Sequence, residues 1–211
     1  MVDPVFEPLR QLKSPIFVMP YENIDTDQIL PARFMTTARR VNLADALFRD
    51  LRDRGTSEPA AELDRIDHGT RRALVAGRNF GAGSSREHAV WALADCGFRV
   101  IISSKIADIF AGNAARNGML TIEVPNPINE ALLKSRGMDV QVDLLGGMLT
   151  VPGIGLSHSF SMDPFARLCL SEGRDPLAFL LGQSSEIARY AQLGCVPSPD
   201  LRAALGLITR N

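Results

Sequence analysis

Short apolar runs alternate with amphipathic stretches through the first two thirds of the chain. The runs have the composition of buried strands, and they lie at residues 15–19, 73–76, 100–102 and 120–124. The run at 100–102 is continuous, as in strands that are buried on both faces of a parallel sheet. Apolar-rich stretches at 84–95 and 107–117 are predicted helices, and the second ends at Gly118, a residue type common just after a helix. The order strand, helix, strand, helix, strand predicts an α/β domain.

The last third of the chain has a different pattern. Residues 140–144 and 148–151 alternate between apolar and polar around Gly146-Gly147, which predicts a β-hairpin. A last helix is predicted at about 185–193, ending at Gly194. Two helices before it are expected to open with Asp at the N-cap and Pro at the first helical position, at Asp163-Pro164 and Asp175-Pro176.

The segment before the second apolar run is less regular. Leu43, Leu47 and Leu51 fall on one face of a predicted amphipathic helix that Gly55 would close. Residues 56–72 are polar with no clear period, so they predict a surface loop.

The composition is that of an ordinary globular protein. The 211 residues, 45% of them hydrophobic and 22% charged, suffice for one good core. We expect a loosely held N-terminal arm, one domain and a C-terminal tail, at residues 1–13, 14–194 and 195–211. A net charge of −1 gives no reason to expect a nucleic acid or an acidic membrane as a partner. The first residues carry acids and no long apolar run, so we expect neither a signal peptide nor a membrane span, and a cytoplasmic location.

Cysteine chemistry is not expected to carry the function. Cys96, Cys169 and Cys195 are widely spaced and include no Cys-x-x-Cys pair. They therefore predict neither a disulfide framework nor a zinc site, and they are a poor set of ligands for an iron–sulfur cluster. We expect no metal site in this chain.

The candidate chemistry lies where three glycines, at 77, 81 and 83, lead from the apolar run at 73–76 into a helix. Ser84 and Glu87 fit a capping box, and a helix that starts there presents free N–H groups and a positive dipole end to an anion. Arg86 adds a guanidinium suited to a carboxylate. The alternative is a plain strand-to-helix turn with a capping serine. A dinucleotide or P-loop fingerprint is not present, because Arg86 replaces the third glycine and no Gly-Lys-Ser/Thr follows.

Residues 83–89, Gly-Ser-Ser-Arg-Glu-His-Ala, resemble the signature of the swivelling domain of the aconitase superfamily, and most closely that of the small subunits of bacterial 3-isopropylmalate dehydratase. Further segments agree in family order over about residues 14–192, at 23–31, 97–102, 107–110, 117–120 and 163–167. The resemblance implies a three-layer β/β/α domain. It also implies one chain of a two-chain hydro-lyase of leucine biosynthesis, whose large subunit holds a [4Fe–4S] cluster in a heterodimer or heterotetramer.

The resemblance also implies roles for particular residues in the isomerisation of 2-isopropylmalate and 3-isopropylmalate. Ser84 would be the base, Arg86 would bind a substrate carboxylate, and Ser85 would cap the helix if Ser84 does not. Asp27 would orient other charged groups, although two aspartates in a turn also fit backbone capping. An arginine of the basic segment at 32–42 would bind another carboxylate. Alignment to the small subunits points to Arg40 and counting as in aconitase points to Arg39, with Arg33 a weaker candidate.

Three residues depart from the common small-subunit pattern, namely Ala82, Ala32 and Lys105. Lys105 would lie near the site and change which substrate side chain fits. The alternatives are therefore a paralogous small subunit for a related 2-hydroxy dicarboxylate, of the methylmalate, dimethylmalate or homoaconitate type, and a non-catalytic binding module that keeps the fold.

Overall fold

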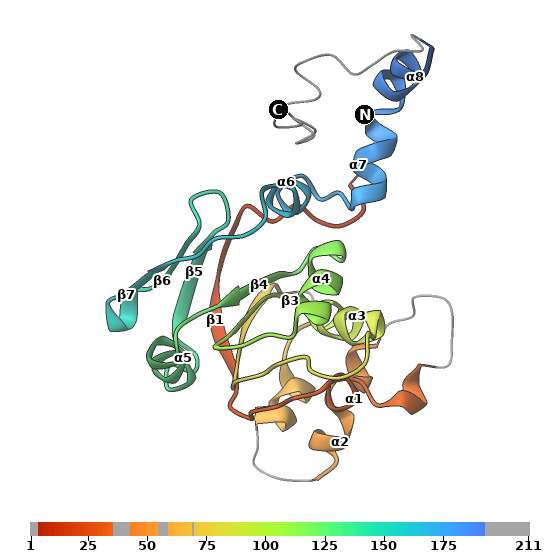
Figure 1. The fold of residues 1–211 in the computed structure, drawn as a ribbon. Coiled ribbons are helices and arrows are strands. Elements are labelled where there is room, and N and C mark those ends of the chain that lie inside the picture. The colour runs from red at the N-terminus through yellow and green to blue at the C-terminus, as the bar shows by residue number, and fades with distance from the viewer. Residues whose placement is uncertain (1–3, 36–42, 55–58, 69, 193–211) are drawn as a thin grey trace, which may run out of the picture.

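A computed structural model describes residues 4–35, 43–54, 59–68 and 70–192 (Figure 1). In this part of the chain seven strands form one mixed sheet in the order β4-β3-β2-β1-β5-β6-β7. The strands are β1 Gln11–Met19, β2 Arg72–Ala76, β3 Phe98–Ser103, β4 Leu120–Glu123, β5 Asp139–Asp143, β6 Met148–Val151 and β7 Leu156–Ser159. The half from β4 to β1 is parallel, and the half from β1 to β7 is antiparallel.

The long strand β1 joins the two halves. Its residues 11–15 pair with β5 and its residues 16–19 pair with β2. One buried cluster contains alternate residues of both halves, so the halves cover the same core from two sides (Figure 1). These residues include Leu12, Ile16, Val75, Val100, Val142 and Leu149.

Helices cover the other face of the parallel half. Phe17, Met19 and Leu74 point to that face and share a second buried cluster with residues of α3 and α4. The helices are α1 Thr26–Ile29, α2 Arg49–Arg52, α3 Glu87–Asp95, α4 Asp108–Arg116, α5 Asn126–Leu133, α6 Pro164–Glu172, α7 Pro176–Gly182 and α8 Ser184–Gln192. The layer that contains α3 and α4 and the two parts of the sheet make the three-layer β/β/α arrangement, so the predicted α/β class is confirmed.

Several local predictions are also confirmed. Asp163 and Asp175 cap α6 and α7 by accepting hydrogen bonds from Ala166 N–H at 2.8 Å and Ala178 N–H at 2.6 Å. The β5–β6 hairpin lies where the alternating pattern placed it, and Gly118 follows α4 with a positive φ.

Other predictions are wrong. The helix expected from Leu43 to Leu51 is broken, because Phe48 adopts a left-handed conformation between the 3₁₀ turn Ala44–Ala46 and α2. The segment expected to be a surface loop contains a 3₁₀ helix, Pro59–Arg65, whose Leu63 is buried. Sequence reasoning did not predict β7.

The N-terminal segment also differs from the prediction. β1 begins at Gln11, inside the expected loose arm, and Leu9 is buried with its N–H donating to Leu170 O at 2.9 Å. Leu9 and Leu12 therefore belong to the core, and the segment that carries them is part of the domain. The expected tail at 195–211 and the helix end at Gly194 lie outside the described residues. None of the described helices has the length and apolar character needed to cross a membrane.

Candidate functional site

The loops that follow β1 and β2 meet at the carboxyl edge of the parallel half, because the two strands are neighbours in the sheet. Gly81 N–H donates to Ile24 O at 2.7 Å, and Thr26 N–H donates to Ala82 O at 2.9 Å. The Thr26 hydroxyl donates to Ser84 O at 3.1 Å. This edge is where open α/β sheets commonly bind ligands.

Two glycines permit this close approach. Gly81 has φ of +75°, and a Cβ there would overlap the Phe110 ring of α4. A Cβ on Gly77 would overlap the backbone of Tyr21 in the loop after β1. The loop from residue 77 to 86 is therefore shaped by the glycines noted in the sequence.

The helix start differs from the prediction. α3 begins at Glu87, its N-cap is Arg86, and no side chain caps it, so the predicted capping box of Ser84 and Glu87 is wrong. The Ser84 carbonyl is held by Thr26, and the Glu87 carboxylate accepts from Asn117 Nδ2 at 2.8 Å, so tertiary contacts replace the local motif. Ser84 and Ser85 are both exposed, and within the described residues the Ser84 hydroxyl makes no hydrogen bond.

The two aspartates after β1 have different partners. Asp25 caps α1 in a true capping box, with Oδ1 accepting from Gln28 N–H at 2.7 Å and Gln28 Oε1 accepting from Asp25 N–H at 3.0 Å. Asp27 instead accepts a hydrogen bond from the Arg86 guanidinium. The side chain of Arg86 is 22% exposed and that of Asp27 is 53% exposed, so the pair lies at the surface with the two serines nearby in sequence.

Two asparagines complete the arrangement, Asn113 in α4 and Asn117 at the C-cap of α4, and the sequence analysis gave them no role. Asn113 Nδ2 donates to Ser85 Oγ at 3.3 Å, while its Oδ1 accepts from Arg116. Asn117 accepts from Trp91 Nε1 at 2.8 Å and holds Glu87, the first residue of α3. A buried asparagine among the apolar residues of a predicted helix was the available signal.

Comparisons with known proteins agree with this architecture. Residues 9–127 match the family model of the aconitase C-terminal domain. The chain is 45% identical to the 3-isopropylmalate dehydratase small subunit of Anaeromyxobacter dehalogenans (strain 2CP-C), over 87% of this chain and 97% of that protein. The chain belongs to the aconitase superfamily, in the family of 3-isopropylmalate dehydratase small subunits.

Other relatives and a solved structure bear on the family. The small subunit of Solibacter usitatus (strain Ellin6076) is 43% identical over 87% of this chain and 93% of that protein. The crystal structure of the 3-isopropylmalate dehydratase from Methanocaldococcus jannaschii superposes with a TM-score of 0.68 at 23% identity, over 85% of this chain and 99% of that one. That likeness is evidence for the fold of the family.

Of the three arginines proposed to bind a second carboxylate, Arg33 lies within the described residues, and its guanidinium is paired with Asp50. Arg33 Nη2 contacts Asp50 at 2.5 Å, and its guanidinium lies 4.7 Å from the centre of the Phe34 ring. The hydrogen bond to Asp50 raises the pKa of Arg33, although the pair is open to solvent. Arg39 and Arg40 lie outside the described residues, so the choice between them stays open.

Lys105 lies at the carboxyl end of β3, the next strand along the sheet from β2. Its backbone carbonyl accepts from Phe80 N–H at 3.0 Å, so it adjoins the glycine loop. Its ammonium contacts Glu123 Oε1 at 3.2 Å. The side chain is thus directed toward the end of β4, and its effect on the substrate stays a prediction.

The described residues do not fit an iron–sulfur cluster. They contain no group of three or more His, Cys, Asp or Glu side chains able to hold a metal ion. Cys96 lies in the core and its Sγ contacts Ala44 O at 3.4 Å, and Cys169 is buried in α6. Burial raises the pKa of the Cys96 thiol to about 12, which disfavours the thiolate that binds metals. Cys195 lies outside the described residues.

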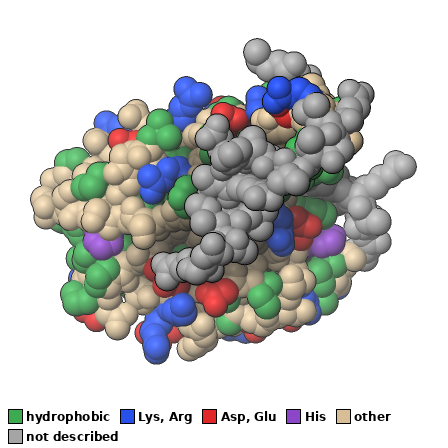
Figure 2. Space-filling model, turned by 45° about the horizontal axis from the view of Figure 1, so that its top comes forward, with side chains coloured by type: hydrophobic (Ala, Val, Ile, Leu, Met, Phe, Trp, Pro, Cys, Tyr) green, Lys and Arg blue, Asp and Glu red, His purple; other side chains and the backbone are tan. Residues whose placement is uncertain are grey.

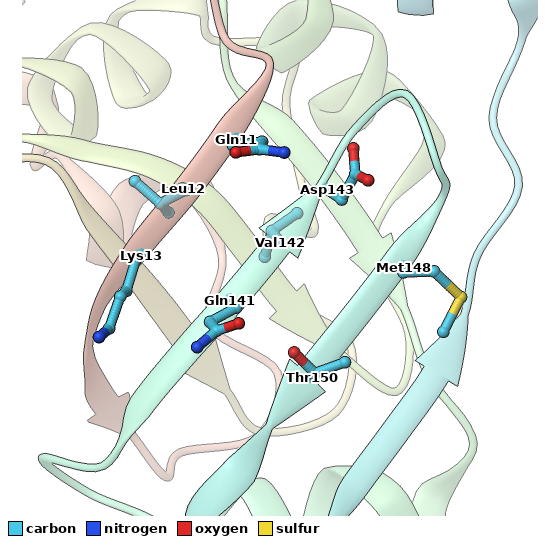
Figure 3. Close-up of a pocket in the computed structure, with 8 residues that line it drawn as sticks. All are labelled: Gln11, Leu12, Lys13, Gln141, Val142, Asp143, Met148 and Thr150. Atoms are coloured by element: carbon cyan, nitrogen blue, oxygen red, sulfur yellow. The ribbon is translucent and has the colours of Figure 1, made fainter.

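One hollow on the described surface lies on the antiparallel half of the sheet and does not include the serines. It has a volume of about 460 Å³ and covers the outer face of β1, β5 and β6, where Lys13, Gln141 and Thr150 face solvent (Figure 3). The face in Figure 2 shows basic side chains interspersed with acidic ones rather than gathered in one patch. Within the part of the chain that the structure describes, this hollow is lined by neither the serines nor Arg86.

Proposed function

We propose that this chain is the small subunit of a two-chain hydro-lyase that interconverts 2-isopropylmalate and 3-isopropylmalate by dehydration and rehydration in leucine biosynthesis. The observation that carries the proposal is the exposure of Ser84 and Ser85 in the loop that also carries Arg86, at the carboxyl edge of the sheet. The proposed location is the cytoplasm, and the proposed assembly is a heterodimer or heterotetramer.

Arg86 would bind one carboxylate of the dicarboxylate substrate. Its guanidinium has five N–H donors and Asp27 occupies part of that set, so donors remain for a ligand. Asp27 would hold the fork in one orientation. A second carboxylate would bind Arg40 or Arg39, with Arg33 a weaker candidate because Asp50 already engages it.

Ser84 would take the proton from the carbon next to the departing hydroxyl group. Because Ser84 does not cap α3, no hydrogen bond within the described residues occupies its hydroxyl group. A serine hydroxyl is too weak an acid to ionise unaided, so it needs positive charge nearby. Arg86 and the N-terminal end of α3 would supply that field.

The second chain would supply what this one lacks. Since the described residues do not fit a [4Fe–4S] cluster, the cluster would belong to the large subunit, where its iron would act as a Lewis acid. We therefore expect the isolated chain to fold, to carry no iron and to be inactive. Stoichiometric iron in the purified chain would contradict this.

The test is reconstitution with a cluster-loaded large subunit of the same family. We expect turnover of 2-isopropylmalate by the wild-type pair and a fall in kcat of about 10²–10⁴ for Ser84→Ala, as for loss of a general base. Ser157→Ala, an exposed serine of β7, is the control and should keep wild-type kcat. Full activity of Ser84→Ala would remove the proposed base.

Two alternatives are separated by the same assay. Lys105 at the edge of the site favours a paralogue for a related 2-hydroxy dicarboxylate, which would show its highest kcat/KM with a methylmalate, dimethylmalate or homoaconitate substrate. A non-catalytic module would give no turnover of any of these substrates with any cluster-loaded partner.

A further inference from the structure

Asn113 is a polar residue on the buried face of α4, whose other buried residues are apolar. It is 3% exposed and lies beside Phe110 and Ala114, which are buried in the same core cluster. An amide in such surroundings is unfavourable unless its hydrogen bonds are made. The amide of Asn113 makes two hydrogen bonds, one with Ser85 in the loop before α3 and one with Arg116 in α4.

The orientation of the Asn113 amide is fixed by Arg116, one turn further along α4. A guanidinium can only donate, so the atom of Asn113 that it contacts must be the acceptor Oδ1. The NH₂ group is then left to face Ser85, and Nδ2 donates to Ser85 Oγ at 3.3 Å. A flipped amide would place NH₂ against the guanidinium and is excluded.

This direction sets the polarity of the Ser85 hydroxyl. Because Ser85 Oγ accepts from Asn113, the hydroxyl proton must point elsewhere, and Ser85 is exposed at the surface that carries Arg86. A chain of donors thus runs from Arg116 through Asn113 to Ser85 and ends on a proton available to an acceptor. Hydrogen bonds aligned in this way strengthen one another, and the natural terminal acceptor is an anion.

We propose that Asn113, held by Arg116, is a positioning residue that makes Ser85 a hydrogen-bond donor to a substrate carboxylate. This inference rests on the proposed function and adds two residues to it that touch no substrate. Asn113 acts through Ser85, so removing either residue should weaken the same interaction.

The kinetic test is a double-mutant cycle in the reconstituted two-chain enzyme. Asn113→Leu removes the donor without adding charge, and Ser85→Ala removes the hydroxyl. Each should raise the KM for the dicarboxylate roughly tenfold with little change in kcat, and the double variant should match Ser85→Ala within about twofold. Effects that multiply, or an unchanged KM in Asn113→Leu, would overturn the inference. Gln141→Leu, the same kind of change on the outer face of β5, is the control and should leave KM unchanged (Figure 3).

A second variant guards against misfolding of Asn113→Leu. Arg116 is exposed, so Arg116→Gln should fold normally, and its loss frees the amide of Asn113 to rotate. We expect a smaller rise in KM, about two- to fivefold on a weaker hydrogen bond. A wild-type KM in Arg116→Gln would show that the amide needs no support and would contradict the proposed chain of donors.

A readout independent of activity separates this inference from the proposed function. In the isolated full chain, the side-chain amide NMR resonance of Asn113 should shift in Ser85→Ala and Arg116→Gln and stay in place in Ser84→Ala. An Asn113 side-chain resonance that does not shift in Ser85→Ala would overturn the inference even if the enzyme is active. Lack of turnover by the wild-type pair overturns the proposed function, and with it the positioning role, whatever the resonance does.

Discussion

At the scale of single residues, the pair of Arg86 and Asp27 orients a charge rather than stabilising the fold. The Asp27 carboxylate is half exposed, and surface ion pairs contribute only about 0–1 kcal/mol. The pair nevertheless bridges the loops after β1 and β2, so it fixes where the guanidinium points. Its value would lie in ligand binding.

Replacing Arg86 by Gln tests whether the ion pair contributes to substrate binding rather than to the stability of the fold. We expect the apparent free energy of substrate binding to weaken by about 2–5 kcal/mol, as for loss of a desolvated charged hydrogen bond, while the melting temperature stays near the wild-type value. Measurements of kcat/KM in the reconstituted enzyme and of thermal unfolding check the two halves. Arg136→Gln, which removes an exposed ion pair with Glu62 elsewhere, is the matched control and should affect neither.

Cys96 gives a residue-scale prediction for pH. Burial raises its pKa in the folded chain from 9.0 to about 12, so between these values the folded state keeps a proton that the unfolded state releases. Stability should therefore be fully present below pH 9 and fall as the pH rises toward 12. Cys96→Ala should show a shallower loss of unfolding free energy over this window than the wild type, measured by urea unfolding.

The same burial predicts an inert thiol. At pH 8 the native chain should not be alkylated at Cys96 by iodoacetamide, and labelling should appear on unfolding. Rapid labelling of Cys96 in the native chain, located by peptide mass mapping, would contradict its place in the core.

At the scale of elements, local chemistry was informative where it had no tertiary competitor. The Asp-Pro starts of α6 and α7 could be predicted because cap and first turn lie within four residues. Ser84 and Glu87 matched the capping-box pattern equally well. In the structure, however, the Ser84 carbonyl accepts a hydrogen bond from Thr26 and the Glu87 carboxylate accepts one from Asn117. The partners come from segments 58 and 30 residues away, which no local pattern specifies.

The helix predicted from Leu43, Leu47 and Leu51 is wrong for a related reason. Leu47 is fully buried, as the stripe predicts, but the chain reaches the core through a 3₁₀ turn and a left-handed Phe48 rather than through one helix. Burial of the right side chains was therefore predictable, while the backbone path between them was not. The serines and Arg86 were found from a motif, whereas the contact of Asn113 with Ser85 depends on the packing of α4 against the loop, which no local pattern specifies.

Replacing Gly81 of the loop and Gly112 of α4 by alanine should change the unfolding free energy in opposite directions. Gly81→Ala forces a left-handed conformation and an overlap with Phe110, and each should cost about 1–3 kcal/mol of unfolding free energy. Gly112 lies in α4 with open space around its Cα, so Gly112→Ala should stabilise the chain by about 0.5–1 kcal/mol. Urea unfolding of both variants checks the pair, and equal effects would contradict the described loop.

At the scale of the whole molecule, the apolar surface is concentrated on the last helices. α7 and α8 extend away from the layered body in Figure 1, and of α7 only Ala178 is buried. Exposed apolar side chains of α6, α7 and α8 are Phe165, Leu168, Leu177, Leu180, Leu181, Ile187 and Tyr190. On α6, Cys169 is buried, while Phe165 and Leu168 remain partly exposed.

This distribution predicts that the helical extension adds little to the stability of the isolated chain. Leu180→Gln combined with Leu181→Gln keeps helix propensity and should change the unfolding free energy by less than about 0.5 kcal/mol. Leu93→Ala, in the core beneath α3, should cost about 2–5 kcal/mol and serves as the positive control. A loss above about 1 kcal/mol for the glutamine pair would mean that these leucines are covered in solution. The midpoint of unfolding would then be measured at several protein concentrations. A midpoint that depends on concentration would mean that a second copy of the chain covers the leucines, and a constant midpoint would mean that residues 193–211 of the same chain cover them.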